Sequence, residues 1–241
     1  MHIVLTQNEM LTGAGVALLI VGIALRQMRP RHFYFVRHGE TLLNAEHIRQ
    51  GAEGALSTKG RAQAVQVGEA LKGLSIRRIF SSTYPRAKET ALILAQTLHA
   101  RVTYTELLVE RRNPSQIIGK STLDPSVMHI VDEMDLAYHD DAYQFSDEET
   151  FLELKNRARK CLNMLANKGG YATTVVTHHV MLKMLVAYAG YREHLHAQDF
   201  IKLTFFNFSD NAGITILEYH PWKAFSATRG WVVTGYNQRA N

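Results

Sequence analysis

The fold of this chain is decided by the stretch HFYFVRHGETLLN, residues 32–44. Aromatic and β-branched side chains dominate residues 32–37, and such a run predicts a short buried strand. The polar string RHGE overlaps the end of that run, so Arg37 and His38 are expected where the strand stops. The position matters because ligands bind at the carboxyl ends of the strands in an open parallel sheet.

The rest of the chain alternates strand-like and helix-like segments. Strands are predicted at 76–81, 102–108 and 172–177, and the later stretches 201–206, 213–219 and 231–236 are expected to extend or flank the sheet. Apolar residues at helical spacing predict two buried helix faces, Ala87, Ala91, Leu94 and Leu98, and Phe151, Leu154, Ala158, Cys161 and Leu165. Ser146 and Glu149 predict a capping box that opens the second helix. The pattern indicates an α/β fold with a mainly parallel sheet.

Composition excludes several classes of protein. The 241 residues are 46% hydrophobic and 20% charged, which argues against a disordered chain, a collagen and a multi-span membrane protein. A single cysteine, Cys161, cannot form an internal disulfide or a thiolate zinc site. It favours a reducing compartment, and we therefore expect a cytoplasmic protein.

The N-terminus needs its own interpretation. Residues 11–25 are uncharged and largely apolar, but a membrane-spanning helix needs about 20 such residues. We expect residues 1–30 to lie outside the fold, either as an anchor or upstream of a true start at Met28, and residues 31–241 to form one domain. Membrane association is expected only through residues 11–25, and the arginines that follow them would leave the domain facing the cytoplasm.

Charge is distributed unevenly along the chain. Residues 121–154 contain ten acidic residues and no Lys or Arg, while the whole chain has 27 basic and 22 acidic residues. The remainder is therefore strongly basic, and a basic body favours an anionic partner such as nucleic acid or a phosphorylated small molecule. Aromatic residues do not alternate with the clustered arginines, which argues against nucleic acid.

Four sets of polar residues follow the first four predicted strands. Arg37 and His38 follow the first, Arg86 the second, Glu110 the third and His178 the fourth. Each residue taken alone is most simply a surface charge or a structural histidine. Because the strands are expected to be parallel, all four sets should meet in one crevice.

These strings resemble a known family. RHGETLLN, SSTYPRAKETA, VERRNPS and VVTHH are similar, in order and spacing, to the motifs of the histidine phosphatase superfamily, the phosphoglycerate-mutase-like branch 1. The resemblance covers roughly residue 31 to the C-terminus. It implies a three-layer sandwich with a mostly parallel six-stranded sheet flanked by helices, and a helical insertion over the site where the acidic segment falls.

The resemblance also implies a catalytic role for each matching residue. His38 would be the nucleophile, attacking phosphorus through an unprotonated ring nitrogen while the other nitrogen donates to a backbone carbonyl or similar acceptor. Arg37 and Arg86 would clamp the phosphoryl oxygens, because a planar guanidinium matches phosphate geometry.

Three more residues complete the implied site. His178 would donate to the same oxygens and Asn44 would add a neutral contact. Glu110 would protonate the leaving oxygen and then deprotonate the attacking water, with Glu106 as the alternative acid. No metal and no cofactor is expected, since the arginines and histidines supply the positive charge.

The predicted reaction is therefore hydrolysis of a phosphomonoester through a phosphohistidine, with a phosphorylated small molecule or phosphopeptide as substrate. The alternatives are a mutase, which returns the phosphoryl group, and a non-catalytic module that binds phospho-ligands. One departure from the family pattern is His179, where glycine usually follows the second catalytic histidine. A position needing positive φ would make this histidine costly, whereas a pocket-facing ring would contact substrate.

Overall fold

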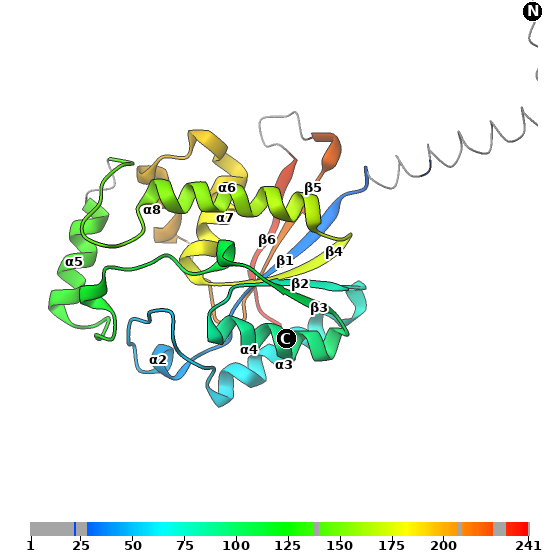
Figure 1. Ribbon diagram of the computed structural model, residues 1–241, viewed down its shortest axis with the longest axis horizontal. Coiled ribbons are helices and arrows are strands. Elements are labelled where there is room, and N and C mark those ends of the chain that lie inside the picture. The colour runs from blue at the N-terminus through cyan, green and yellow to red at the C-terminus, as the bar shows by residue number, and fades with distance from the viewer. Residues whose placement is uncertain (1–21, 23–27, 137–139, 207–208, 224–229, 241) are drawn as a thin grey trace, which may run out of the picture.

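The computed structural model of the protein describes residue 22 and residues 28–136, 140–206, 209–223 and 230–240. These residues form a six-stranded sheet in the order β3-β2-β4-β1-β5-β6 (Figure 1). The strands are β1 (Arg31–Arg37), β2 (Arg78–Ser81), β3 (Arg101–Tyr104), β4 (Ala172–Thr177), β5 (Ile214–Tyr219) and β6 (Trp231–Gln238). The pairs β1–β4, β2–β4 and β2–β3 are parallel, and only β5 runs against its neighbours. The predicted α/β fold with a mostly parallel sheet is confirmed.

Helices cover both faces of the sheet, which makes three layers (Figure 1). They are α2 (Leu42–Ala45), α3 (Thr58–Leu71), α4 (Pro85–Leu98), α5 (Pro125–Leu136), α6 (Phe151–Lys168), α7 (His179–Tyr191) and α8 (Ala197–Phe206). α3 and α4 pack on one face with Val36 and Val176, while α6 and α7 pack on the other with Phe35 and Val175. Because both faces are covered, every residue of β4 is buried.

The two predicted helix faces are confirmed. Every residue of both sets is buried: Ala87, Ala91, Leu94 and Leu98 on α4, and Phe151, Leu154, Ala158, Cys161 and Leu165 on α6. The thiol of Cys161 is inert structural packing, since burial raises its pKa to about 12.

Two of the predicted strands were wrong in detail. The strand predicted at 102–108 ends at Tyr104, because the Thr105 hydroxyl accepts the Leu107 N–H and opens a 3-10 helix, Glu106–Leu108. The stretch 201–206 belongs to helix α8 rather than the sheet, and the Asp141 carboxylate accepts the N–H of its first residue, Ala197 (2.7 Å).

The predicted capping box is also displaced. Helix α6 begins at Phe151, and its capping box is Thr150 with Glu153 instead of Ser146 with Glu149. The reason lies in Glu148, whose carboxylate accepts the N–H of Ser146 (2.7 Å) and holds that residue in a preceding turn.

The acidic segment supplies α5 and the approach to α6. In Figure 1, α2 and α5 both lie on the side of the sheet at which β1 ends. Two backbone bonds tie the start of this segment and the residue before it to the loop after α2: Arg49 N–H donates to the Lys120 carbonyl (2.9 Å) and Thr122 N–H to the His47 carbonyl (2.7 Å). The insertion is thereby anchored at the edge where the predicted site lies.

The N-terminal segment predicted to lie outside the fold is, apart from Gly22 and residues 28–30, outside the described residues, and the sheet begins at Arg31. Among the helices that the structure describes, none is long and apolar enough to cross a membrane.

Candidate active site

His38 lies directly after β1 and is almost completely buried. Its Nδ1 is 2.8 Å from the Gly39 carbonyl oxygen, which can only accept, so Nδ1 carries the proton. Nε2 therefore has a lone pair, and the Nε–H of Arg86 donates to it at 3.3 Å. The ring is held in the tautomer that a nucleophile at Nε2 needs.

The charge state of His38 follows from its surroundings. Burial lowers its pKa well below the usual value, and the nearby positive charges of Arg86 and Arg37 lower it further, against a smaller opposing effect from the Gly39 carbonyl. The imidazole is therefore neutral at physiological pH.

Arg86 lies in the first turn of α4, just after Pro85, and its side chain is held from behind. Nη1 donates to the carbonyl oxygens of Gly51 (3.0 Å), Ala52 (3.3 Å) and Glu53 (2.9 Å). Three backbone acceptors fix one edge of the guanidinium. The group is thus oriented before any ligand arrives.

Arg37 approaches His38 from the end of β1. Its Nη1 donates to the Ser209 carbonyl (2.5 Å). Its Nε is buried and has no partner within the part of the chain that the structure describes. A buried guanidinium N–H without an acceptor is costly, by about 1–3 kcal/mol.

His178 precedes helix α7 and is fully buried, with its ring centroid 5.0 Å from that of His38. Its Nε2 is 2.7 Å from the Ser82 hydroxyl oxygen, which already accepts the N–H of Tyr84 (3.2 Å). The hydroxyl proton can point at Nε2, and in that arrangement the imidazole proton is on Nδ1. That atom is buried and has no partner among the described residues.

Glu110 lies on the irregular segment after the 3-10 helix Glu106–Leu108, and its carboxylate sits at the N-terminus of α7. Oε1 accepts the N–H groups of Arg111 (2.9 Å), Val180 (3.1 Å) and Met181 (3.0 Å). Among the hydrogen bonds between described residues, Oε2 accepts that of Val180 alone (3.2 Å). Oε2 is therefore the oxygen with capacity to carry a proton.

Their positions relative to the two arginines distinguish Glu110 from Glu106, the alternative acid. The negative charge of Glu110 raises the pKa of both Arg37 and Arg86, against the larger lowering by burial. Glu106 is exposed on the 3-10 helix. The structure thus brings Glu110 to the two arginines.

Asn44 has a local structural role in addition to any contact with substrate. Its side chain and that of Thr41 form the capping box of α2. Asn44 Oδ1 also accepts from the amide of Asn211 (3.3 Å), and the same amide nitrogen donates to the His38 carbonyl (3.1 Å). Asn44 is therefore linked through Asn211 to the loop of residues 38–41 that follows β1, which we call the nucleophile loop.

His179 is the first residue of α7, and its φ is not positive, so the histidine introduces no backbone strain. Its Nδ1 lies 2.6 Å from the Ser209 hydroxyl oxygen. Burial, with the charges of Arg37 and Lys183, lowers its pKa to about 3. The His179 ring is therefore a neutral group close to Arg37.

Sequence reasoning missed Lys183, Ser82 and Ser209. Lys183 lies one turn after His179 on α7, and burial with the charge of Arg37 lowers its pKa to about 8. Its spacing of four from His179 was a usable signal. Ser82 belongs to the SSTYPRAKETA motif. No local pattern indicates Ser209, because it reaches the site from a loop that is distant in sequence.

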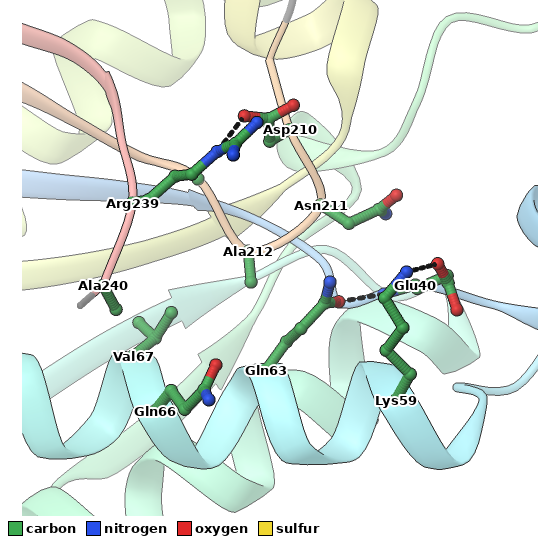
Figure 2. Close-up of a pocket in the computed structure, with 11 residues that line it drawn as sticks. Glu40, Lys59, Gln63, Gln66, Val67, Asp210, Asn211, Ala212, Arg239 and Ala240 are labelled. Carbon is green, nitrogen blue, oxygen red and sulfur yellow. Dashed lines mark hydrogen bonds and ion pairs between the residues drawn. The ribbon is translucent and has the colours of Figure 1, made fainter.

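A pocket of about 390 Å³ is lined by Glu40 from the loop after β1, by residues of α3 and by residues 210–213 (Figure 2). Its residues hold that loop: Ala212 N–H donates to the Arg37 carbonyl (3.0 Å), and Gln63 Oε1 accepts the N–H of Glu40 (2.9 Å). Two ion pairs, Lys59–Glu40 and Arg239–Asp210, flank the pocket. The pocket walls are thus part of the scaffold of His38.

Within the described residues, no group of three or more His, Cys, Asp or Glu side chains is arranged to hold a metal ion. The polar groups of the site are the guanidinium groups of Arg37 and Arg86, the imidazoles of His38 and His178, whose pKa values are lowered well below the usual value by burial first and by nearby positive charges, and the carboxylate of Glu110.

Comparison with curated proteins finds local similarity. The chain is 47% identical over 78 residues to the probable phosphoglycerate mutase GpmB of Salmonella choleraesuis, and 46% identical over 78 residues to that of Salmonella arizonae. These matches cover 32% of this chain and 36% of each relative. The chain thus aligns with about a third of the length of these relatives.

Comparison with solved structures covers nearly the whole fold. The structure called mycobacterial hydrolase 2 matches with a TM-score of 0.73 and 25% identity, over 89% of this chain and 93% of that one. Mycobacterial glucosyl-3-phosphoglycerate phosphatase in complex with VO3 has a TM-score of 0.70 and 24% identity, covering 86% and 99%. A putative alpha-ribazole-5'-P phosphatase of Escherichia coli has 0.69 and 18%, covering 87% and 97%.

The family model of the histidine phosphatase superfamily (branch 1) matches residues 33–231. That range contains His38, Arg86, Glu110 and His178, and it includes all of the sheet from Phe33 to the first residue of β6. The chain belongs to the histidine phosphatase superfamily, branch 1.

Proposed function

We propose that the protein hydrolyses phosphomonoesters through a covalent phosphohistidine on His38, without a metal ion. One observation carries the proposal: His38 Nε2, which keeps its lone pair, accepts the Nε–H of Arg86, whose guanidinium is fixed by three backbone carbonyls, and the His178 ring lies 5.0 Å from the His38 ring between centroids. The Nε–H of Arg37 and Nδ1 of His178 are buried and have no hydrogen-bond partner among the described residues. Phosphoryl oxygens would supply the missing acceptors, with charge-assisted bonds to the arginines.

The first step transfers the phosphoryl group to the protein. When substrate binds, the Arg86 Nε–H turns from Nε2 to a phosphoryl oxygen. The freed Nε2 lone pair forms a bond to phosphorus as the bond to the ester oxygen breaks, and Glu110, protonated at Oε2, gives its proton to the leaving oxygen. Arg37, Arg86 and His178 donate to the oxygens over which charge spreads. The Gly39 carbonyl stabilises the positive charge that the ring acquires.

The second step returns the site to its starting state. Glu110, now a carboxylate, takes a proton from water as the water oxygen attacks phosphorus. The phosphorus–nitrogen bond breaks, the electron pair returns to Nε2 and inorganic phosphate leaves. Glu110 ends protonated, so atoms and charge balance over the cycle.

A phosphorylated small molecule or a phosphopeptide is the substrate class we propose. Support comes from the solved relatives named as phosphatases of a glucosyl-3-phosphoglycerate and of alpha-ribazole-5'-P. A panel of phosphorylated metabolites and phosphopeptides, assayed in a chelating buffer, tests both substrate class and metal independence. Turnover that requires an added metal would contradict the proposal.

A mutase activity is the second candidate, and the identity of 47% to a probable phosphoglycerate mutase over 78 residues favours it. The two activities share the first step and differ in whether water or a second substrate oxygen takes the phosphoryl group. Incubating the protein with a phosphoglycerate and following both free phosphate and positional isomers separates them. Phosphate release without isomerisation supports the hydrolase, and binding of phosphate esters without either product would support a non-catalytic module.

A further inference from the structure

A buried ion pair joins the acidic segment to helix α6. Arg157 Nε and Nη2 donate to the two carboxylate oxygens of Glu149 at 2.7 and 2.6 Å. The two side chains are only 14% and 11% exposed. The contact is a two-point fork, the geometry in which arginine and carboxylate specify orientation as well as charge.

The rest of the Arg157 guanidinium is directed at the segment that carries the proposed acid. Nη1 donates to the carbonyl oxygens of Val109 (2.6 Å) and Leu107 (3.4 Å), and Nη2 donates to that of Glu110 (3.4 Å). Nη1 also lies 3.3 Å from the sulfur of Met181 on α7. One planar group thus spans α6, α7 and the segment around Glu110.

Glu149 ties the same segment a second time through its backbone. Its N–H donates to the Arg112 carbonyl (2.9 Å), and its carbonyl accepts the Nε–H of Arg111 (3.1 Å). Residues on both sides of Glu110 are therefore held by Glu149 or by Arg157. This matters because the segment lies between two 3-10 helices, Glu106–Leu108 and Ser115–Ile117, and belongs to no strand or α-helix.

We propose that Arg157, oriented by Glu149, is a positioning residue that sets Glu110 for proton transfer to the leaving oxygen. The inference rests on the proposed function of Glu110. Arg157 acts through the backbone of 107–110, and the Glu110 carboxylate is fixed at its other end by the N–H groups of Val180 and Met181. A displacement of about 1 Å at a reacting group costs about 10²-fold in rate.

The leaving group of the substrate provides a sharp test. An alkyl phosphate needs a proton on its departing oxygen, whereas a dinitrophenyl phosphate leaves as a stable phenolate and needs none. The wild type, Arg157→Lys and the control Arg159→Lys are compared in single-turnover release of the alcohol or phenol, so that only the first step is followed. Lysine keeps the charge of Arg157 but cannot form the fork.

The control lies on the same helix, and among the described residues Arg159 makes no hydrogen bond or ion pair to 107–112 or to Glu149. For Arg157→Lys we expect a loss of about 10²-fold with the alkyl phosphate and of less than about threefold with the dinitrophenyl phosphate. The substrate concentration that half-saturates the single-turnover rate is expected to be unchanged for both substrates, and Arg159→Lys is expected to match the wild type with both.

Equal losses with the two substrates, or no loss with either, would overturn the positioning role. If Arg157→Lys does not fold, Glu149→Gln provides the same comparison, because it removes the charged fork while keeping side-chain volume. Trapping of phosphohistidine on the wild type decides the proposed function separately. Its absence refutes the function, whereas a loss in the variant that does not depend on the leaving group refutes only the role of Arg157.

Discussion

At the scale of single residues, the behaviour of His38 follows from its burial and from its contacts. Burial, and then the positive charges of Arg86 and Arg37, lower its pKa and keep the imidazole neutral, while the Gly39 carbonyl fixes the proton on Nδ1. Both conditions are needed, because a nucleophilic imidazole must be both neutral and in the correct tautomer. The arrangement therefore links the burial of the site directly to its chemistry.

Burial of the histidines at the site also makes the free energy of unfolding depend on pH, and His179 gives the clearest case. Its pKa in the folded protein is lowered to about 3, while an unfolded histidine titrates near pH 6.5. Below that pH the unfolded chain binds a proton that the folded chain refuses, so stability falls as the pH falls. Asparagine at this position keeps a polar side chain without titrating.

We therefore expect the free energy of unfolding of the wild type, measured relative to His179→Asn, to fall by about 2 kcal/mol between pH 7 and pH 5. Urea unfolding of both proteins at several pH values measures the difference. A difference that stays constant with pH would show that His179 is solvated in the folded state.

The elements of the fold could be predicted where a local pattern determines them. The buried faces of α4 and α6 and the complete strand β4 follow from side-chain periodicity and β-branched content. The 3-10 helix Glu106–Leu108 and the start of α6 could not be predicted in this way. At each place a side chain, Thr105 or Glu148, accepts a nearby backbone N–H and so competes with regular secondary structure. Such competition is decided by the surrounding structure, and periodicity does not report it.

The carboxylate of Glu110, the proposed acid, caps the N-terminus of helix α7. The same side chain therefore contributes to catalysis and to the stability of the helix. Glu110 accepts the N–H groups of Val180 and Met181. Glutamine keeps a capping oxygen but cannot transfer the proton, and alanine removes both functions. We expect Glu110→Gln to lower kcat by about 10²–10⁴-fold with stability within about 1 kcal/mol of the wild type.

For Glu110→Ala we expect the same kinetic defect with a further loss of about 1–2 kcal/mol in the free energy of unfolding, as for other removed helix caps. Denaturant unfolding of the three proteins measures the separation. Equal stability of the glutamine and alanine variants would mean that the carboxylate does not cap α7 in solution.

Helix α3 supports the nucleophile loop through a close approach between Gly60 and the backbone of Gly39 and Glu40. A Cβ on Gly60 would collide with the Glu40 carbonyl oxygen. Gly60→Ala is therefore expected to displace the loop, lowering kcat at least about tenfold and stability by about 1–3 kcal/mol, in the range for overpacking. Gly73→Ala is the control, since a Cβ there meets nothing within 4 Å; equal effects of the two changes would contradict the account.

For the whole molecule, the site could be predicted to the extent that parallel topology brings strand ends together. Arg37, Arg86, Glu110 and His178 are far apart in sequence, yet β1, β2 and β4 are adjacent in the sheet. The positions of Ser209 and of the Glu149–Arg157 pair could not be predicted from the sequence, because no local pattern specifies how their segments pack. Tertiary packing, rather than sequence spacing, places them at the site.

We propose that residues 31–241 form the domain, because β1 begins at Arg31 and the Arg31 side chain donates to the Ala166 carbonyl on α6 (2.6 Å). A protein of residues 28–241 is expected to unfold at the same denaturant midpoint as the full chain and to keep its kcat. A lower midpoint would show that residues before Met28 contribute to the fold.

The central claim is that His38 Nε2 becomes bonded to phosphorus. Rapid quenching of the protein with a ³²P-labelled phosphomonoester, followed by peptide mapping at alkaline pH, tests this directly. We expect acid-labile label on the peptide that contains His38 in the wild type, accumulation of that label in Glu110→Gln with a good leaving group, and none in His38→Ala. Label on another residue, or turnover retained by His38→Ala, would contradict the account.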